Sequence, residues 1–115
     1  MGKQVKFEKV NMREIDRIFK GRKFDACVHQ GVMEHFDEDE IPYLHKKQLK
    51  VAKKVIFSVP LKTKRNMKYF RGGLIKYRNL WNKEYWVKNV LKDFKIIDQR
   101  LLRQRTDNLV IVLVS

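Results

Sequence analysis

The stretch FDACVHQGVMEHFDEDEIPYLHKKQLKVAKKVIFSVP, residues 24–60, decides the fold of this 115-residue chain. It opens with a short apolar run at 24–29 that has the composition of a strand. It closes with a β-branched run at 54–60, which ends at a proline that cannot donate to a strand ladder. Two strands joined through one helix form a βαβ unit, in which the strands are parallel and the crossover is right-handed. The chain is therefore expected to be an α/β protein.

The helix between these two strands is predicted from its charges and its apolar face. Asp37 is a suitable N-cap, and Glu40 stands three residues later, as in a capping box. Acidic residues crowd this positive end of the helix dipole, and lysines gather near the other end. Ile41, Leu44 and Val51 fall on one face at helical spacing, so this face is expected to pack on the sheet.

The residues before this unit predict a further strand and a short helix. Alternating apolar residues at 5–10 fit a strand with one buried face. Asn11 is a plausible N-cap for a helix over 12–20, and Gly21 is expected to end that helix in a left-handed conformation.

The residues after position 81 predict one helix and two strands. Asn82 can cap a helix over 83–94 that has one apolar face. The runs at 95–102 and 109–114 read as strands, and the short turn between them requires an antiparallel hairpin. The run at 109–114 is apolar at every position, so we expect it to be buried on both faces, inside the sheet, with 95–102 at an edge.

Composition predicts a folded single domain over residues 1–115. The hydrophobic fraction is 43%, and no apolar run approaches the ~20 residues of a membrane span. The N-terminal residues lack the apolar segment of a secretory signal, which predicts a cytoplasmic protein with no membrane association. Cys27 lies in an apolar strand without a second cysteine to pair with, so core packing in a reducing compartment is expected.

The net charge of +14 is concentrated after residue 60. Residues 61–81 are basic and rich in aromatics, and a long connection of this kind is typical of a lid or a binding loop. Such a segment attracts polyanions such as RNA or steers an anionic substrate, although a solvated surface would have the same composition. The aromatic residues that we expect to contact a substrate or partner are Tyr69, Phe70 and Tyr77.

Residues 24–36, followed by the acidic helix start and the run at 55–60, resemble strands 4 and 5 of class I S-adenosylmethionine-dependent methyltransferases. The resemblance extends to the C-terminus and so covers nearly all of the chain. It implies a partial Rossmann-like methyltransferase sheet, with parallel strands, a C-terminal antiparallel hairpin and helices packed on the sheet.

The resemblance also implies a site at the carboxyl ends of the strands, where open parallel sheets bind ligands. Glu34 and His35 would lie at the rim of this crevice as general base or substrate ligand, or they would merely shape the loop. Some relatives hold a divalent metal through Glu-x-x-Glu-His, but Gly31 replaces the first of those residues, so no metal is predicted. The residues implied to contact S-adenosylmethionine are Asn11, Met12, Gln30 and Gly31.

Part of the family's cofactor pocket is missing from the sequence. Methyltransferases of this class carry a glycine-rich loop after strand 1 and an acidic residue after strand 2, and no Gly-x-Gly occurs here. In the family strand order 3-2-1-4-5-7-6, the chain would omit the two strands between residues 5–10 and 24–29. That omission exposes an apolar edge on the strand at 24–29.

Three explanations follow. The chain is a fragment or split product whose N-terminal half is absent or supplied by another polypeptide, or its two remaining strands pair directly, or two copies join through the exposed edge. We favour the first. The expected function is methyl transfer from S-adenosylmethionine to an undetermined acceptor, with weak or absent cofactor binding by the isolated chain. The alternative is a non-catalytic methyltransferase remnant that binds RNA or a partner protein.

Overall fold

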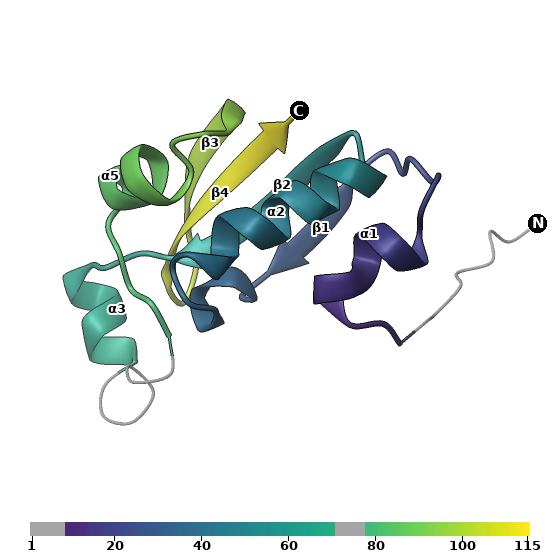
Figure 1. Ribbon diagram of the computed structural model, residues 1–115. Coiled ribbons are helices and arrows are strands. Elements are labelled where there is room, and N and C mark those ends of the chain that lie inside the picture. The colour runs from purple at the N-terminus through teal and green to yellow at the C-terminus, as the bar shows by residue number, and fades with distance from the viewer. Residues whose placement is uncertain (1–8, 71–77) are drawn as a thin grey trace, which may run out of the picture.

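The computed structural model describes residues 9–70 and 78–115, which form helices and strands around one four-stranded sheet (Figure 1). In chain order the elements are the 3-10 helix η1 (Met12–Glu14), α1 (Ile15–Ile18), β1 (Cys27–Gln30), the 3-10 helix η2 (Met33–His35), α2 (Glu40–Val51), β2 (Lys54–Pro60), α3 (Lys64–Tyr69), α5 (Lys83–Tyr85), the π-helical turn η3 (Trp86–Val90), β3 (Lys95–Arg103) and β4 (Asp107–Val114).

The strand order of the sheet is β1-β2-β4-β3. β1 pairs with β2 in parallel, and the connection between them runs through α2, which confirms the βαβ unit. β4 is antiparallel to both β2 and β3, so it lies inside the sheet and leaves β3 at an edge. The predicted α/β class and the C-terminal antiparallel hairpin are therefore confirmed.

Two boundaries of the βαβ unit differ from the prediction. Phe24 makes a single bridge to Ala52, and the regular strand begins only at Cys27, because the intervening exposed Asp25 lies outside the ladder. The helix α2 begins at Glu40 rather than next to Asp37. The backbone oxygen of Asp37 accepts hydrogen bonds from the amides of Glu40 and Ile41 at 3.0 and 3.2 Å, so a turn made by the backbone, without a side-chain cap, starts this helix.

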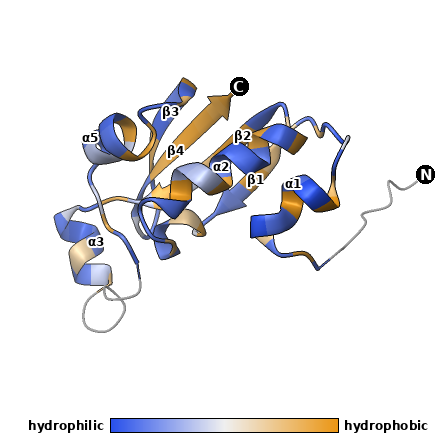
Figure 2. Cartoon of the chain, in the orientation of Figure 1, coloured by the Kyte–Doolittle hydropathy of each residue, from blue (hydrophilic) through white to orange (hydrophobic). Residues whose placement is uncertain are grey.

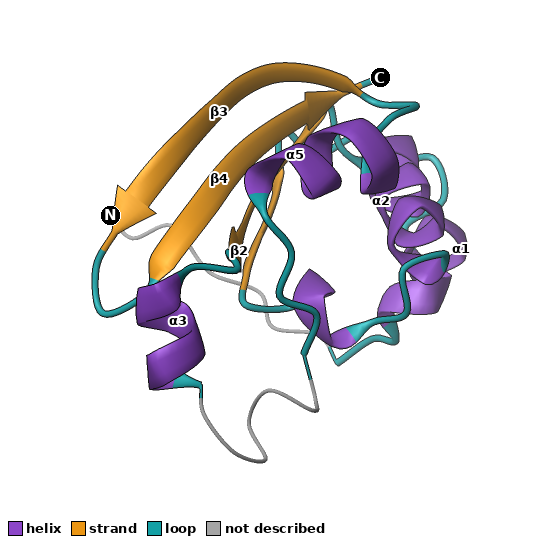
Figure 3. Ribbon diagram, turned by 90° about the vertical axis from the view of Figure 1, so that its left-hand side faces the viewer, coloured by secondary structure: helices purple, strands orange, loops and turns teal. Residues whose placement is uncertain are grey.

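The helices α1, α2 and α5 occupy one side of the sheet in Figure 3. The hydrophobic core lies on that side, between the sheet and the residues of η2, α2 and η3. Figure 2 shows that hydrophobic residues are concentrated on β2 and β4, whereas α3 is mostly hydrophilic. Leu109, Ile111 and Leu113 of β4 are fully buried against the helices, but the alternate residues of this strand are half-buried. The expectation that both faces of β4 are buried is wrong, because no helix of the described residues covers the second face.

The N-terminal helix is shorter than predicted. Asn11 caps it as expected, with its Oδ1 accepting from the amide of Arg13 at 3.0 Å, but the helix ends at Ile18. Gly21 adopts a φ of +83°, the left-handed conformation predicted for it. Most of the strand predicted at 5–10 lies outside the described residues.

The second capped helix changes its hydrogen-bonding pattern after one turn. Asn82 Oδ1 accepts from the amide of Tyr85 at 2.8 Å, which confirms the predicted cap. From Trp86 onward the turn is π-helical, and it buries Trp86, Val90 and Leu91 against the sheet. No helix within residues 9–70 and 78–115 is long and apolar enough to cross a membrane.

Candidate functional site

A cavity of about 590 Å³ lies at the carboxyl ends of the parallel strands β1 and β2, next to the turn that joins β3 to β4. This is the edge of the sheet at which ligands of open α/β folds bind. Three segments that are distant in sequence contribute to its wall. The lining residues are Gln30, Gly31, Glu34, Pro60, Tyr69, Phe70, Gln104, Arg105, Thr106 and Asn108.

The first wall of the cavity is the loop that leaves β1. The amide of Gly31 donates to the backbone oxygen of Ser58 at 3.2 Å, which extends the contact with β2 to the cavity floor. Gly31 has a φ of +66°, a conformation that side chains with a Cβ rarely adopt. A Cβ at this position would lie 3.6 Å from Glu34 Oε2, an ordinary contact, so backbone conformation rather than space favours glycine here.

Glu34 is the titratable group of this wall. Its side chain is only 3% exposed, and burial raises the pKa of its carboxyl. The charges of His35 and Arg78 act in the opposite direction, and Oε1 has no hydrogen-bond partner among the described residues. A buried carboxyl with a raised pKa can exchange a proton nearer to neutral pH than an exposed one, as general acid–base chemistry requires.

His35 lies beside Glu34 but outside the cavity lining. Its Nε2 is 3.8 Å from Glu34 Oε2, and its side chain is 41% exposed. The structure therefore brings together the two residues that the sequence singled out, with Glu34 facing the cavity and His35 more exposed to solvent.

The second wall consists of α3 and the residue that follows it. Tyr69 is half exposed, whereas Phe70 is buried, and their ring centroids are 5.0 Å apart in an edge-to-face contact. The guanidinium of Arg78 lies 4.2 Å from the centroid of the Phe70 ring. Tyr69 and Phe70 both line the cavity, with Phe70 as a buried wall residue, and their contact with a substrate stays a prediction. Tyr77 lies outside the described residues.

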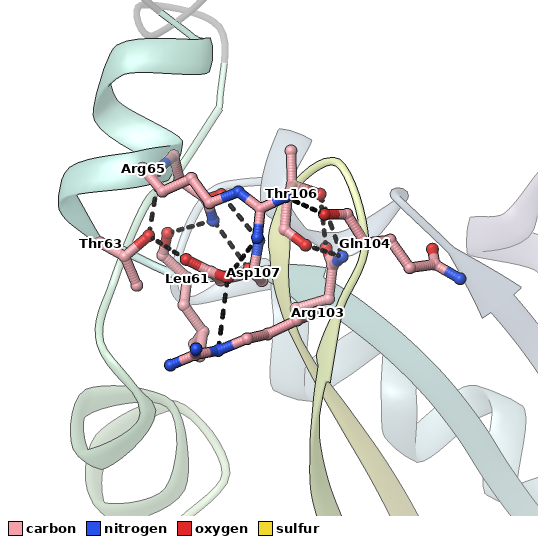
Figure 4. A network of polar contacts seen from close by, with 9 residues as sticks. Leu61, Thr63, Arg65, Arg103, Gln104, Thr106 and Asp107 are labelled. Carbon is pink, nitrogen blue, oxygen red and sulfur yellow. Dashed lines mark hydrogen bonds and ion pairs between the residues drawn. The ribbon is translucent and has the colours of Figure 1, made fainter.

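A polar network holds α3 against the turn between β3 and β4 (Figure 4). The buried side chain of Asn66 donates to the backbone oxygens of Leu61 and Asp107, both at 2.7 Å, and accepts from the amide of Asp107 at 2.8 Å. Thr63 Oγ1 donates to Asp107 Oδ2 at 2.8 Å. Arg65 donates to the backbone oxygen of Gln104 and forms an ion pair with Asp107 at 3.5 Å. The network fixes the position of Tyr69 and Phe70 relative to the β-hairpin.

Asn79 holds the β1 loop from the other end of the 61–81 segment. The backbone N–H of Asn79 donates to the backbone oxygen of Glu34, and its side-chain Nδ2 donates to the backbone oxygen of Phe36, both at 2.6 Å. Sequence reasoning did not identify this residue or the turn at 104–106. The available signal was topological, because a hairpin whose second strand is antiparallel to β2 places its turn at the carboxyl end of β2.

The structure does not bring Asn11 and Met12 to this cavity. Asn11 caps the helix η1, and Met12 Sδ lies 3.7 Å from Gln48 Nε2 on α2. Neither residue lines the cavity. Their assignment to a cofactor stays a prediction.

Cys27 and His29 of β1 are half-buried on the side of the sheet that faces the helices. Burial raises the pKa of the Cys27 thiol, which opposes formation of a reactive thiolate. The His29 ring stacks on His45 and Phe57, with centroids 5.5 and 5.2 Å apart, and burial lowers its pKa. Within the described part of the chain no three His, Cys, Asp or Glu residues are grouped in a way that could hold a metal ion.

Comparison with known proteins identifies the fold. No family model and no curated protein matches the sequence. Solved structures do match, and they show that the chain has a class I methyltransferase-like fold.

Three of the matching structures are methyltransferases. The chain is similar to magnesium protoporphyrin IX methyltransferase from Synechocystis PCC 6803 with bound SAH, with a TM-score of 0.64 and 17% identity over 91% of this chain and 48% of that one. The methyltransferase domain of bacterial CtHen1 matches with a TM-score of 0.63 and 20% identity, over 92% and 59% of the two chains. The small RNA methyltransferase HEN1 matches with a TM-score of 0.62 and 20% identity, over 91% and 15%. The chain thus spans about half the length of the first two.

Proposed function

We propose that this chain is part of an S-adenosylmethionine-dependent methyltransferase, a truncated or split domain whose methyl acceptor is undetermined. The cavity at the carboxyl ends of β1 and β2 carries the proposal. It gathers Gln30 and Gly31, which the sequence predicts to contact the cofactor, with the predicted catalytic residue Glu34 and the predicted substrate contacts Tyr69 and Phe70. The methyltransferase-like fold supports the same assignment.

The residues present fit S-adenosylmethionine in part. Gln30 and Gly31 offer a strand end without a bulky side chain, beside a buried carboxyl, as one wall of a cofactor site. When bound, the cofactor supplies the activated methyl group, and the protein supplies alignment and a dry environment. On the far side of β1, however, the described residues provide no further strand, and the sequence has no Gly-x-Gly. We therefore expect the isolated chain to bind the cofactor weakly.

An NMR titration of the ¹⁵N-labelled chain with S-adenosylhomocysteine tests the proposal. The amides of Gln30, Gly31 and Glu34 should shift, with a dissociation constant of about 1 mM. The variant Gly31→Ala should weaken binding further, because its φ of +66° disfavours a Cβ. Gly21→Ala is the matched control, since Gly21 also has a positive φ, of +83°, but does not line the cavity.

Two results would contradict the proposal. Shifts confined to other residues, or no shifts at millimolar ligand, would remove the cofactor site. Micromolar affinity would show that the chain contains a complete site and would overturn its description as truncated.

We further propose that the acceptor of the methyl group is a polyanion such as RNA. Lys62, Lys64 and Lys68 are exposed on and before α3, next to the half-exposed Tyr69 at the cavity. Basic side chains bind phosphates with counterion release, and an exposed aromatic ring can stack on a base. One of the structural relatives is named a small RNA methyltransferase, which is consistent with such an acceptor.

The test is a triple substitution of these three lysines by glutamine, with RNA affinity measured at several salt concentrations. The variant should bind a single-stranded RNA more weakly and with a shallower salt dependence. Arg65 is left in place, because it holds α3 to the hairpin. A control variant replaces the exposed Lys20, Lys46 and Lys88 by glutamine. It has the same net charge as the test variant, but the lost charges lie elsewhere on the surface. Equal losses in both variants would exclude a specific RNA surface at α3.

The same measurements separate the enzyme from the alternative, a non-catalytic module that binds RNA or a protein. RNA binding at α3 without any shift of Gly31 or Glu34 on addition of S-adenosylhomocysteine would favour the alternative. Both responses together support the methyltransferase.

A further inference from the structure

The outer edge of β1 has no partner strand among the described residues. The amide of Gly31 points toward β2, because it donates to Ser58. Backbone groups alternate along a strand, so the N–H and C=O groups of Val28 point away from β2, and the C=O of Gln30 does so as well. An unpaired edge of this kind is a template for a strand from another polypeptide.

The sheet face next to this edge is aliphatic and uncovered. Register places Val28, Ile56 and Val112 in one row across β1, β2 and β4, with Val110 and Leu102 beside them. Val28 is 69% exposed and Leu102 is 40% exposed, and the helices α1, α2 and α5 all lie on the other side of the sheet (Figure 3). A groove of about 270 Å³ is lined by four of these residues, Val28, Ile56, Leu102 and Val110, together with His29, Gln30, Phe57, Ser58 and Gln104.

A second apolar hollow lies on the helix side, beside the start of β1. It has a volume of about 220 Å³ and is lined by residues of α1 and of the approach to β1, among them Ile15, Phe19, Phe24 and Ala26. Side chains of an added strand alternate between the two faces of the sheet. A strand laid along β1 would therefore direct its alternate side chains toward one apolar hollow or the other.

The chemistry around the open face selects the kind of partner. The aliphatic residues are flanked by Lys54, Lys95 and Arg100, and the acid of this face, Asp98, is paired with Arg100 at 3.3 Å. The residues that line the open-face groove include no exposed aromatic ring. The bases of a nucleic acid therefore have no aromatic ring to stack on in this groove. A second copy of the chain would bring together two bodies of net charge +14.

We propose that the β1 edge and the open face bind an acidic polypeptide with aliphatic side chains, which adds a strand to β1 and covers the face. Because Gln30 belongs both to the groove and to the 590 Å³ cavity, this partner would also close the cavity on its open side. The inference rests on the proposed function, because a split domain leaves this edge and face for a complementing polypeptide, and it is tested on different residues.

The experiment titrates the ¹⁵N-labelled full chain with two synthetic peptides of about nine residues, in which a central run of valines is flanked by glutamates or by lysines. The acidic peptide should shift the amides of Val28, Ile56 and Val112, and the basic peptide should not. Val28→Glu should weaken acidic-peptide binding at least about tenfold. Leu101→Glu is the matched control. Leu101 is a similarly exposed aliphatic residue, at 62%, on the other edge strand, and its pairing with Leu109 places it on the opposite face.

Several outcomes would overturn the inference. Failure of the acidic peptide to bind, or equal binding of the basic peptide, would reject an acidic partner. Self-association in sedimentation velocity that Val28→Glu abolishes would assign the face to a second copy. Slow hydrogen exchange at Val28 in the monomer would show that the chain covers its own edge, and shifts of the same residues with oligouridine would indicate RNA. The S-adenosylhomocysteine titration is read at Gly31 and Glu34, so failure of either proposal is distinguishable from failure of the other.

Discussion

Protonation of one buried histidine should destabilise the fold below neutral pH. His45 on α2 is fully buried, and its ring lies 4.4 Å from Phe57 and 5.9 Å from Phe94. Neither ring nitrogen has a hydrogen-bond partner among the described residues. Burial, with a smaller contribution from His29, lowers the pKa of His45 from 6.5 to about 3.

The direction of the pH effect on stability follows from the linkage between proton binding and folding. The folded state binds the proton more weakly than the unfolded state, so the contribution of His45 to stability is complete above pH 6.5 and is lost as pH falls toward 3. The loss is about 1.4 kcal/mol per pH unit, or about 2 kcal/mol between pH 8 and pH 5. His29 acts in the same direction, because burial lowers its pKa too, and Glu34 acts in the opposite direction.

Urea unfolding of the wild type and of His45→Leu at pH 8 and pH 5 isolates this contribution. The contribution of Glu34 is common to both proteins and cancels in the comparison, and the contribution of His29 cancels apart from its small electrostatic coupling to His45. The variant should lose about 2 kcal/mol less stability than the wild type between the two pH values. His35→Leu, which removes a more exposed imidazole, shows how much of the change follows from losing any histidine. If wild type and His45→Leu have the same pH dependence, the buried neutral histidine does not carry the effect.

Three further predictions concern the site and its supports. Because burial raises the pKa of Glu34, its contribution to stability should fall as pH rises through 4.5 and above, so Glu34→Gln should gain more stability with rising pH than the wild type does in a series of urea melts, and equal pH dependence would remove this contribution. Asn66→Ala should cost about 3 kcal/mol, because it removes three hydrogen bonds between a buried side chain and the backbone of Leu61 and Asp107; a loss below about 1 kcal/mol in urea unfolding would show that water replaces the side chain. Asn82→Ala should lower the stability by about 1 kcal/mol through loss of its helix cap, measured by thermal unfolding, and an unchanged melting temperature would mean that the cap is dispensable.

Local patterns predicted the central part of the fold. β-branched runs bounded by turns located β2 and β4, and the length of the connection through α2 required β1 and β2 to be parallel. Gln30, Gly31 and Glu34, which line the cavity, can be predicted as site residues from the sequence. The rule that ligands bind at the carboxyl ends of parallel strands requires only that the end of a strand be located.

The parts of the fold and of the cavity that the sequence does not predict depend on contacts between residues that are distant in the chain. Nothing near Asn66 in the sequence indicates that its side chain pairs with the backbone of Asp107, 41 positions later. The apolar composition of β4 does not reveal which of its faces a helix covers, so Leu109 and Val110 look equivalent in the sequence but differ in burial. The sequence predicts the turn of the β-hairpin only as a connection between two strands, although this turn forms part of the cavity wall.

The position of β4 between β2 and β3 sets an order of events during protein synthesis. Until residues 107–114 have left the ribosome, β2 lacks its antiparallel neighbour, and α3 lacks the hairpin to which Asn66 and Thr63 attach it. Contacts of such long sequence separation form late, after the loop-closure cost of bringing their ends together has been met. The cavity is therefore completed only after β4 has been synthesised, and a nascent chain released before that point would lack the wall that α3 contributes to the cavity.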